Sequence, residues 1–376
     1  MRVKAAAAVA AILLIACTGS TSPSPPTASP GAGVAATKAA DLRVRLDLLL
    51  GEHVLLIGKE SAAAAYVTDE YPGYLGLLAA NGAELQDVMR LAFGNTAAGE
   101  LGALWAEQNN GLVEYAVGLV THKQSLADAS AAALNATFVP QYAKLISSLT
   151  RLPSDQLAAL VSQQVSATET AIGDAARQSF SQMYADLHNA YTLTTRLGDT
   201  LAPRIAQLFP DKFPGDPTLS AVDTRVRVSS LLQEHAYLTT MATDAVARGR
   251  STEAPAVNLA LGGSSTVLGT AFVQLLGSSA GTQAEQLWWD TRVSDLLHYA
   301  AGTGTKASVV QDFVARFAAL AGIDQKLVAG ELDATIVVVD DQRSRAFDRL
   351  AADDRAAATS MQPIADAMSA AGSVQG

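Results

Sequence analysis

The stretch DLRVRLDLLLGEHVLL, residues 41–56, decides the fold of this chain, because nearly the same letters return as DTRVRVSSLLQEHAYL at residues 223–238. Nine of the sixteen paired positions are identical: the Asp, both Arg, the Val between them, the Leu pair, the Glu, the His and the final Leu. The distance between the two starts, Asp41 and Asp223, is several times the roughly 20 to 50 residues of a solenoid unit. The repeat therefore predicts two copies of one domain-sized unit.

Apolar residues recur at three- and four-residue spacing from residue 41 onward, as in amphipathic helices. In the first copy this pattern and the intervening Gly and Pro residues predict helices over 41–66, 74–93, 96–122, 125–150, 155–177 and 180–209. Pro140 lies inside a helical pattern and predicts a kink or a break there. Residues 335–339, Thr-Ile-Val-Val-Val, have the composition of a strand, but their surroundings favour a buried helical turn.

Three prolines, Pro210, Pro214 and Pro217, interrupt the helical pattern after Phe209 and mark the boundary between the copies. The expected fold is all-α, with two similar antiparallel helical bundles in tandem, residues 41–209 and 219–376, joined by a linker over 210–218. Each bundle is expected to close around its own apolar interior.

The first sixteen residues have the layout of a secretory signal. A basic start with Arg2 and Lys4 precedes an apolar run over 5–16, which is shorter than the roughly 20 residues of a membrane-spanning helix. The letters LIAC at residues 14–17 resemble the lipobox of bacterial lipoproteins. That resemblance implies cleavage before Cys17, acylation of its sulfur, and attachment to the extracytoplasmic face of the cell membrane.

Composition narrows the partners of the mature chain. Residues 17–40 are rich in Ser, Thr, Pro, Gly and Ala, and are expected to form a disordered tether between the lipid and the bundles. Without Arg2 and Lys4, 24 of the 26 basic residues remain against 36 acidic ones, a net charge of −12. Such a charge disfavours nucleic acid as a partner. Cys17 is the only cysteine, so acylation leaves no thiol for a disulfide or a zinc site.

The Glu-His pairs, Glu52-His53 and Glu234-His235, are the best candidates for chemistry. Each His shares a helix face with leucines and is expected to point into a bundle, where an acid on a facing helix would satisfy it. The acids expected in that role are Glu107 and Glu114 in the first copy and Asp290 or Asp295 in the second. Two interpretations remain open for His53, Glu107, Glu114, His235 and Asp290: a structural His–carboxylate contact, or a metal or small-ligand site of the kind that helical bundles build.

Other motifs have simpler interpretations. The paired arginines, Arg43 and Arg45 with Arg225 and Arg227, are expected at helix starts, where they anchor carboxylates or clamp an anion. Trp105 and the Trp288-Trp289 pair are expected in helix packing. Residues 277–281 match Gly-x-Ser-x-Gly, but a nucleophile elbow needs a preceding strand, which the sequence does not predict.

The Leu-Leu-x-Glu-His openings and the Leu-Trp-x-Glu/Asp motifs at 104–107 and 287–290 resemble a group of duplicated helical secreted proteins of actinobacteria and bacilli. In that group a His often follows the acid of the Trp helix, whereas Gln108 and Thr291 hold that place here. The group has no assigned activity, so the resemblance implies the fold and not a reaction. We expect a non-enzymatic envelope lipoprotein that binds or scaffolds another envelope component, without a required cofactor. The alternative is a carrier of a metal or small ligand that uses the bundle-core His.

Overall fold

The computed structural model describes residues 35–311 and 313–372 of the chain. These residues form helices joined by short turns and contain no strand, so the expected all-α class is confirmed. The signal, Cys17 and nearly all of the expected tether lie outside the described residues.

The first half of the chain contains α2 to α8 and the second half contains α9 to α16. The elements of the first half are α2 Lys38–Tyr66, α3 Tyr71–Phe93, α4 Asn95–Val120, α5 Gln124–Ala133, the π-helix η1 Leu134–Phe138, α6 Val139–Thr150, α7 Ser154–Ala176 and α8 Phe180–Leu208. Those of the second half are α9 Ser220–Ala247, α10 Ala254–Leu276, α11 Ser278–Gln286, the π-helix η2 Leu287–Val293, α12 Ser294–Ala300, α13 Lys306–Gln311, α14 Val314–Ala321, α15 Gln325–Ser344 and α16 Phe347–Gly372.

Two local expectations can be compared with these elements. Residues 335–339 lie inside α15, so their interpretation as helix is confirmed. The interruption expected at Pro140 takes the form of η1, a π-helical segment that ends directly before α6, in whose first turn Pro140 lies. A π segment changes the direction of a helix without ending it. The Gly-x-Ser-x-Gly stretch follows helix α10, and its first glycine is the N-cap of α11.

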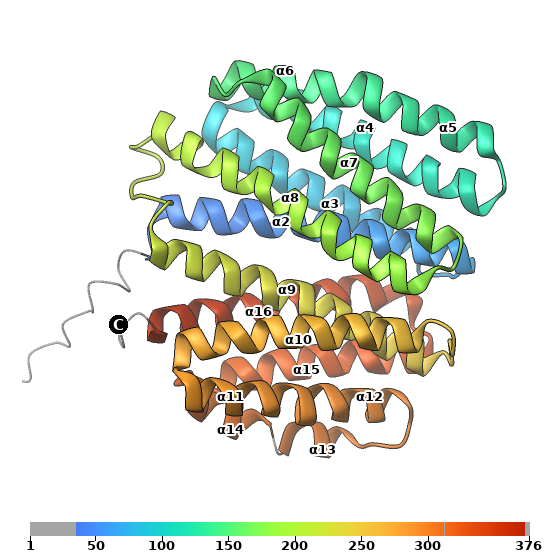
Figure 1. Ribbon diagram of the computed structural model, residues 1–376, viewed down its shortest axis with the longest axis vertical. Coiled ribbons are helices and arrows are strands. Elements are labelled where there is room, and N and C mark those ends of the chain that lie inside the picture. The colour runs from blue at the N-terminus through green and yellow to red at the C-terminus, as the bar shows by residue number, and fades with distance from the viewer. Residues whose placement is uncertain (1–34, 312, 373–376) are drawn as a thin grey trace, which may run out of the picture.

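Helices α2 and α9 lie side by side at the centre of the molecule and run in the same direction. Gln233 of α9 donates to the Leu48 carbonyl of α2 at 3.1 Å, and further along both helices Lys59 donates to Thr240 at 2.8 Å. Because the paired positions advance together, the two helices are parallel. Figure 1 shows them in the middle of the view, with the first half above and the second half below.

The remaining helices cover this central pair on both sides. Around α2 pack α3, α4, α7 and α8, and around α9 pack α10, α12, α15 and α16. The halves also meet where α8 lies against α10 and where α3 lies against α16.

The apolar core runs through both halves as one continuous cluster, in contrast to the two separate interiors that we expected. The reason lies in α2 and α9, whose buried side chains surround each helix instead of forming one stripe. A helix that is buried all round must be covered on every side by other helices. Each central helix is covered on one side by its own half and on the other by the opposite half.

Among the described helices, α10 alone has the length and apolar composition of a membrane span. Here it is a bundle helix that packs on α8, α9 and α11, and 44% of its most apolar window is buried. A core helix of a water-soluble bundle meets the same criteria.

Candidate binding site between the two halves

The two candidate histidines are fully buried, each beside the tryptophan of its own half. The His53 and Trp105 rings have centroids 4.8 Å apart, and those of His235 and Trp288 are 5.6 Å apart. Trp288 Nε1 donates to His235 Nε2 at 2.8 Å, so this nitrogen carries no proton. Burial lowers the pKa of His53 to about 3 and that of His235 well below its usual value. Both rings are neutral core groups at physiological pH.

The acids that we expected to face these histidines lie elsewhere. Glu107, Glu114 and Asp290 are exposed, and Glu114 accepts a hydrogen bond from Ser130 instead. The expectation that they face the histidines is therefore wrong. The physical reason is that a carboxylate costs much less free energy in water than in the apolar bundle interior, where an aromatic N–H can satisfy the imidazole. Within the described residues, no group of three or more His, Cys, Asp or Glu side chains could hold a metal ion.

The glutamates of the Glu-His pairs point to the contact between the halves. Glu52 binds Arg355 of α16 through two hydrogen bonds, at 2.9 and 2.8 Å. Glu234 accepts a 2.6 Å hydrogen bond from His188 Nδ1 of α8. Each glutamate thus pairs with the last long helix of the opposite half. Adjacent residues on a helix point in different directions, so one side chain of each pair enters its own bundle and the other reaches across.

Two of the four paired arginines also link the halves, in a reciprocal pattern. Arg43 binds Asp223 at 2.5 Å and the Pro217 carbonyl at 2.7 Å. Arg225 binds Asp41 at 2.6 Å and the Ala35 carbonyl at 2.9 Å. Each arginine therefore holds the start of the opposite central helix. These partly buried pairs tie the entry of the chain to the linker, where Ala39 donates from its backbone N–H to the Pro214 carbonyl.

A polar cluster also recurs inside each bundle, with different charge. In the first half Gln108 donates to Gln164 at 2.8 Å, and Gln164 contacts Thr168. In the second half the fully buried Arg292 binds Glu331, which in turn accepts from Thr335 at 2.8 Å. Glu331 follows Gln164 in the sequence by the same number of residues as Thr335 follows Thr168. The two clusters therefore lie at equivalent positions of the two halves. A neutral network in one half thus corresponds to a buried ion pair in the other.

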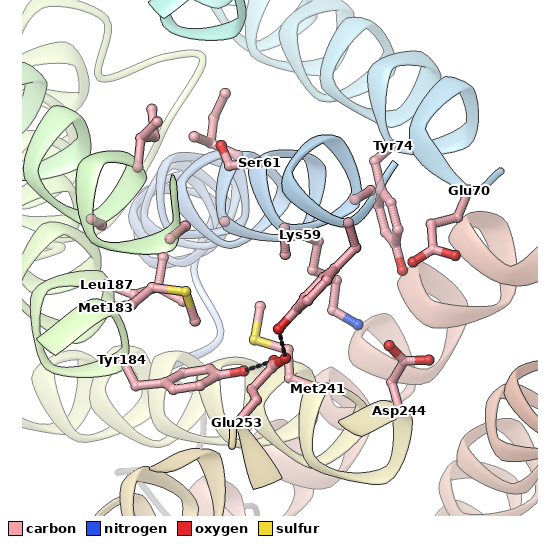
Figure 2. A pocket seen from close by; sticks show the side chains of 18 of the residues that line it. Lys59, Ser61, Glu70, Tyr74, Met183, Tyr184, Leu187, Met241, Asp244 and Glu253 are labelled. Carbon is pink, nitrogen blue, oxygen red and sulfur yellow. Dashed lines mark hydrogen bonds between the residues drawn. The ribbon is translucent and has the colours of Figure 1, made fainter. Parts of the chain in front are cut away.

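A cavity lies between the halves near the C-terminal ends of α2 and α9 (Figure 2). Its enclosed volume is about 40 Å³. The apolar part of its wall comes from both halves and consists of Val54, Ile57, Gly58, Ala62, Ala63, Ala171, Ile172, Ala175, Met183, Leu187, Met241 and Leu350. Its polar part consists of Lys59, Ser61, Tyr66, Glu70, Tyr74, Thr168, Tyr184, Asp244, Arg250, Glu253 and Gln342.

The polar side of the cavity is organised around Glu253. This carboxylate accepts hydrogen bonds from Tyr184 at 2.7 Å, Tyr66 at 2.8 Å and Arg250 at 2.7 Å. Figure 2 shows Tyr184 and a second phenol converging on it. Burial, with the nearby Glu253 charge, raises the pKa of Tyr184 well above its usual value. The phenols therefore remain donors over the whole physiological range.

A second buried charge pair closes the cavity toward α16. Lys59 of α2 forms an ion pair with Asp354 of α16, and Thr240 and Tyr74 donate to the same carboxylate at 2.6 and 3.1 Å. Glu60, next to Lys59 on α2, is also buried, and burial raises its pKa to about 7. The site thus combines satisfied charges, fixed donors and an aliphatic wall, as ligand sites at domain interfaces do.

Sequence reasoning missed most of this site. Tyr184, Arg250, Glu253 and Asp354 are not part of the repeated stretch and follow no spaced motif. The one available signal was Lys59, a charged residue within the apolar pattern of the first helix, where a lysine needs a buried partner. Comparisons of the chain with protein-family models, with curated proteins and with solved structures found no match.

Proposed function

We propose that this protein is a non-enzymatic binding module of the cell envelope, attached to the membrane through an acylated Cys17, that takes a small ligand between its two halves. The cavity beside Glu253 is the observation that carries this proposal. It lies where helices of both halves meet, and its wall combines aliphatic side chains with phenols and paired charges. Ligand sites are typically found at such interfaces.

The size of the cavity limits the ligand. A volume of about 40 Å³ holds two or three water-sized groups, since one water needs roughly 10 to 15 Å³. Pockets for larger metabolites measure roughly 300 to 1,000 Å³. A ligand of a few heavy atoms would enter the closed form, and a larger one would require α8 to move away from the second half.

We also propose that the two halves arose by duplication of one helical unit. The support is that equivalent residues of the two halves, a constant number of positions apart in the sequence, make equivalent contacts. Arg43 and Arg225 hold the same place in the repeated stretch and make reciprocal pairs across the halves. Glu52 and Glu234 are separated by the same number of residues, and each also pairs with a residue of the opposite half.

The alternative carrier function that uses His53 and His235 is not retained. The acids that it requires beside these histidines, Glu107, Glu114 and Asp290, are at the surface.

Mass spectrometry of the full-length protein, purified from membranes in detergent, tests both parts of the proposed function. Under denaturing conditions the mature chain should begin at Cys17 and carry the mass of acyl chains, and a Cys17→Ser variant should lack it. An unmodified wild-type chain would refute the anchor. Under native conditions the wild type should carry an additional non-covalent mass, which denaturation releases.

A cavity-filling variant locates the ligand. Ala171→Val adds two methyl groups to the wall and should lower the fraction with bound ligand about tenfold, a loss of about 1.4 kcal/mol. Ala143→Val, at an equally buried position in α6 away from the cavity, is the matched control and should retain the ligand. Identical native and denatured masses in the wild type, or equal losses in both variants, would reject the cavity as the binding site.

A further inference from the structure

The halves are fastened to each other along two sides of the central helix pair, through equivalent positions. On one side, side chains of α16 reach α2, and on the other, side chains of α8 reach α9; we call these contacts the α2/α16 seam and the α8/α9 seam. Arg355 and His188 occupy equivalent positions in the two seams. They are separated in the sequence by the same number of residues as the equivalent pair Gln164 and Glu331. Their partners, Glu52 and Glu234, are the equivalent glutamates of the repeated stretch.

The α2/α16 seam is held by permanent charges. Arg355 binds Glu52 through two hydrogen bonds, and its third nitrogen pairs with Glu84 of α3 at 2.8 Å. Further along α2, Lys59 pairs with Asp354, which is fully buried. A guanidinium keeps its charge at every physiological pH.

The α8/α9 seam has neutral and titratable contacts in place of these permanent charges, and in it Tyr191 of α8 donates to the Ser230 carbonyl of α9 at 2.9 Å and to Gln233 at 3.1 Å. His188 replaces the arginine, and its side chain is 59% exposed, against 19% for Arg355. The Lys59–Asp354 ion pair has no counterpart, because Met241 and Leu187 occupy the equivalent positions. The buried Glu234 therefore depends on one titratable, solvent-accessible partner.

A second titratable group lies along the same seam. Asp47 of α2 is 1% exposed, and neither of its carboxyl oxygens has a hydrogen-bond donor within the described part of the chain. It lies against Gly198 and beside Asp199, which itself binds Arg43, the residue that links α8 to Asp223 of α9. The equivalent position in the other half is the neutral Ser229, which accepts a hydrogen bond from Gln362.

We propose that the α8/α9 seam is a pH-operated latch between the halves, closed when His188 and Asp47 are protonated and loosened when they lose their protons, while the α2/α16 seam remains fastened and acts as the hinge. This proposal rests on the seam contacts alone and does not depend on whether the cavity binds a ligand. Leu187 of α8 lines the cavity, and the next residue, His188, lines a surface groove of about 240 Å³. Loosening this seam therefore opens the wall of the cavity.

The direction of the pH effect follows from both groups. The hydrogen bond to Glu234 raises the pKa of His188 above 6.5, so its stabilisation is complete below pH 6.5 and disappears as the pH rises through the raised value. Burial and the Asp199 charge raise the pKa of Asp47 well above 3.8, against the opposing effect of Arg43. Ionisation of Asp47 at higher pH then repels Asp199 and competes for Arg43. Both titrations weaken the seam as the pH rises.

Two permanent cations, Arg43 and Arg227, line the same groove as His188, and each is held by other partners. Helix α10, which packs on α8, has no charged residue. The charged or titratable groups that line the groove with His188 are Arg43 and Asp47 of α2, Tyr191 and Asp199 of α8, and Asp223, Arg227 and Glu234 of α9. Of the cations among them, Arg43 is held by Asp199 and Asp223, and Arg227 donates to Gln274.

Spin labels on exposed positions beside the two seams, where α8 packs on α10 and α3 packs on α16, test the latch in the full-length chain with Cys17→Ser. One pair, at Asn189 and Thr270, spans α8 and α10, and the control pair, at Ala79 and Ala356, spans α3 and α16. Between pH 5.5 and 8.5 the dipolar broadening of the Asn189–Thr270 pair should fall at least twofold. That of the control pair should remain constant.

Exchange of the equivalent residues His188 and Arg355 between the seams completes the test. His188→Arg should hold the Asn189–Thr270 pair together at pH 8.5, and Arg355→His should transfer the pH response to the control pair. The proposal is overturned if the wild-type Asn189–Thr270 signal does not change with pH, if both label pairs change alike, or if His188→Arg responds as the wild type does. Should His188→Arg not fold, an unchanged control pair in Arg355→His would overturn it equally.

Discussion

At the scale of single residues, the repeated Glu-His pair does two separate tasks with neighbouring side chains. Its histidine packs beside the tryptophan of its own half, and its glutamate binds a basic side chain from the other half. The two histidines differ in one respect. Trp288 Nε1 donates to His235, whereas Trp105 Nε1 and both nitrogens of His53 have no partner among the described residues.

This difference predicts unequal effects of one substitution. Trp288→Phe removes the donor of a buried hydrogen bond and leaves His235 Nε2 unsatisfied, whereas Trp105→Phe removes a similar volume but no hydrogen bond. Trp288→Phe should therefore lower the free energy of unfolding by about 1 to 3 kcal/mol more than Trp105→Phe. Urea unfolding followed by far-UV circular dichroism measures both, and equal losses would mean that the indole–imidazole bond adds no stability.

At the scale of elements, the helices were predictable because their apolar spacing is a local property. The helix expected over 41–66 is α2, Lys38–Tyr66, and the one expected over 180–209 is α8, Phe180–Leu208. The partners of buried polar groups were not predictable, since they depend on which helices become neighbours. The pairs that join Glu234 to His188 and Lys59 to Asp354 cross between the halves, so periodicity within one helix could not reveal them.

The contact of α2 with α8 gives a prediction at this scale. A Cβ atom on Gly198 would overlap Asp47 Oδ1, so Gly198→Ala should lower the free energy of unfolding by about 1 to 3 kcal/mol. The equivalent pair in the second half is Ala365 and Ser229.

Introducing the second-half pair, alanine and serine, at positions 198 and 47 should relieve the overlap with the Asp47 carboxylate. The double variant Gly198→Ala/Asp47→Ser should regain at least the wild-type stability, because alanine also favours a helix over glycine. A thermal-denaturation double-mutant cycle gives the coupling energy. Additive losses would contradict the close approach of Asp47 to Gly198.

At the scale of the whole molecule, the shared core makes the halves depend on each other. Helices α2 and α9 are each covered by both halves, and the apolar cluster does not stop at the linker. The repeat and the linker were visible in the sequence. The joined core was not, because the sequence of a helix that is buried all round does not indicate which helices cover its second side.

This dependence predicts the behaviour of the separated halves. A fragment of residues 38–209 exposes the side of α2 that α9 covers, and should lack a cooperative urea transition. Addition of an equimolar fragment of residues 219–372 should restore that transition, as measured by circular dichroism. A cooperative transition in the first fragment alone would show that its interior is self-sufficient.

The parallel course of α2 and α9 also gives the molecule a direction. Both helices start where the chain enters from the proposed membrane attachment, and α2, with 29 residues, extends roughly 43 Å at 1.5 Å per residue. Its far end holds Tyr66, and Glu253 lies beside it. If the chain is anchored as proposed and its tethered end faces the membrane, the cavity beside Glu253 lies at the end farthest from the lipid, where a diffusing solute or a neighbouring envelope protein could reach it.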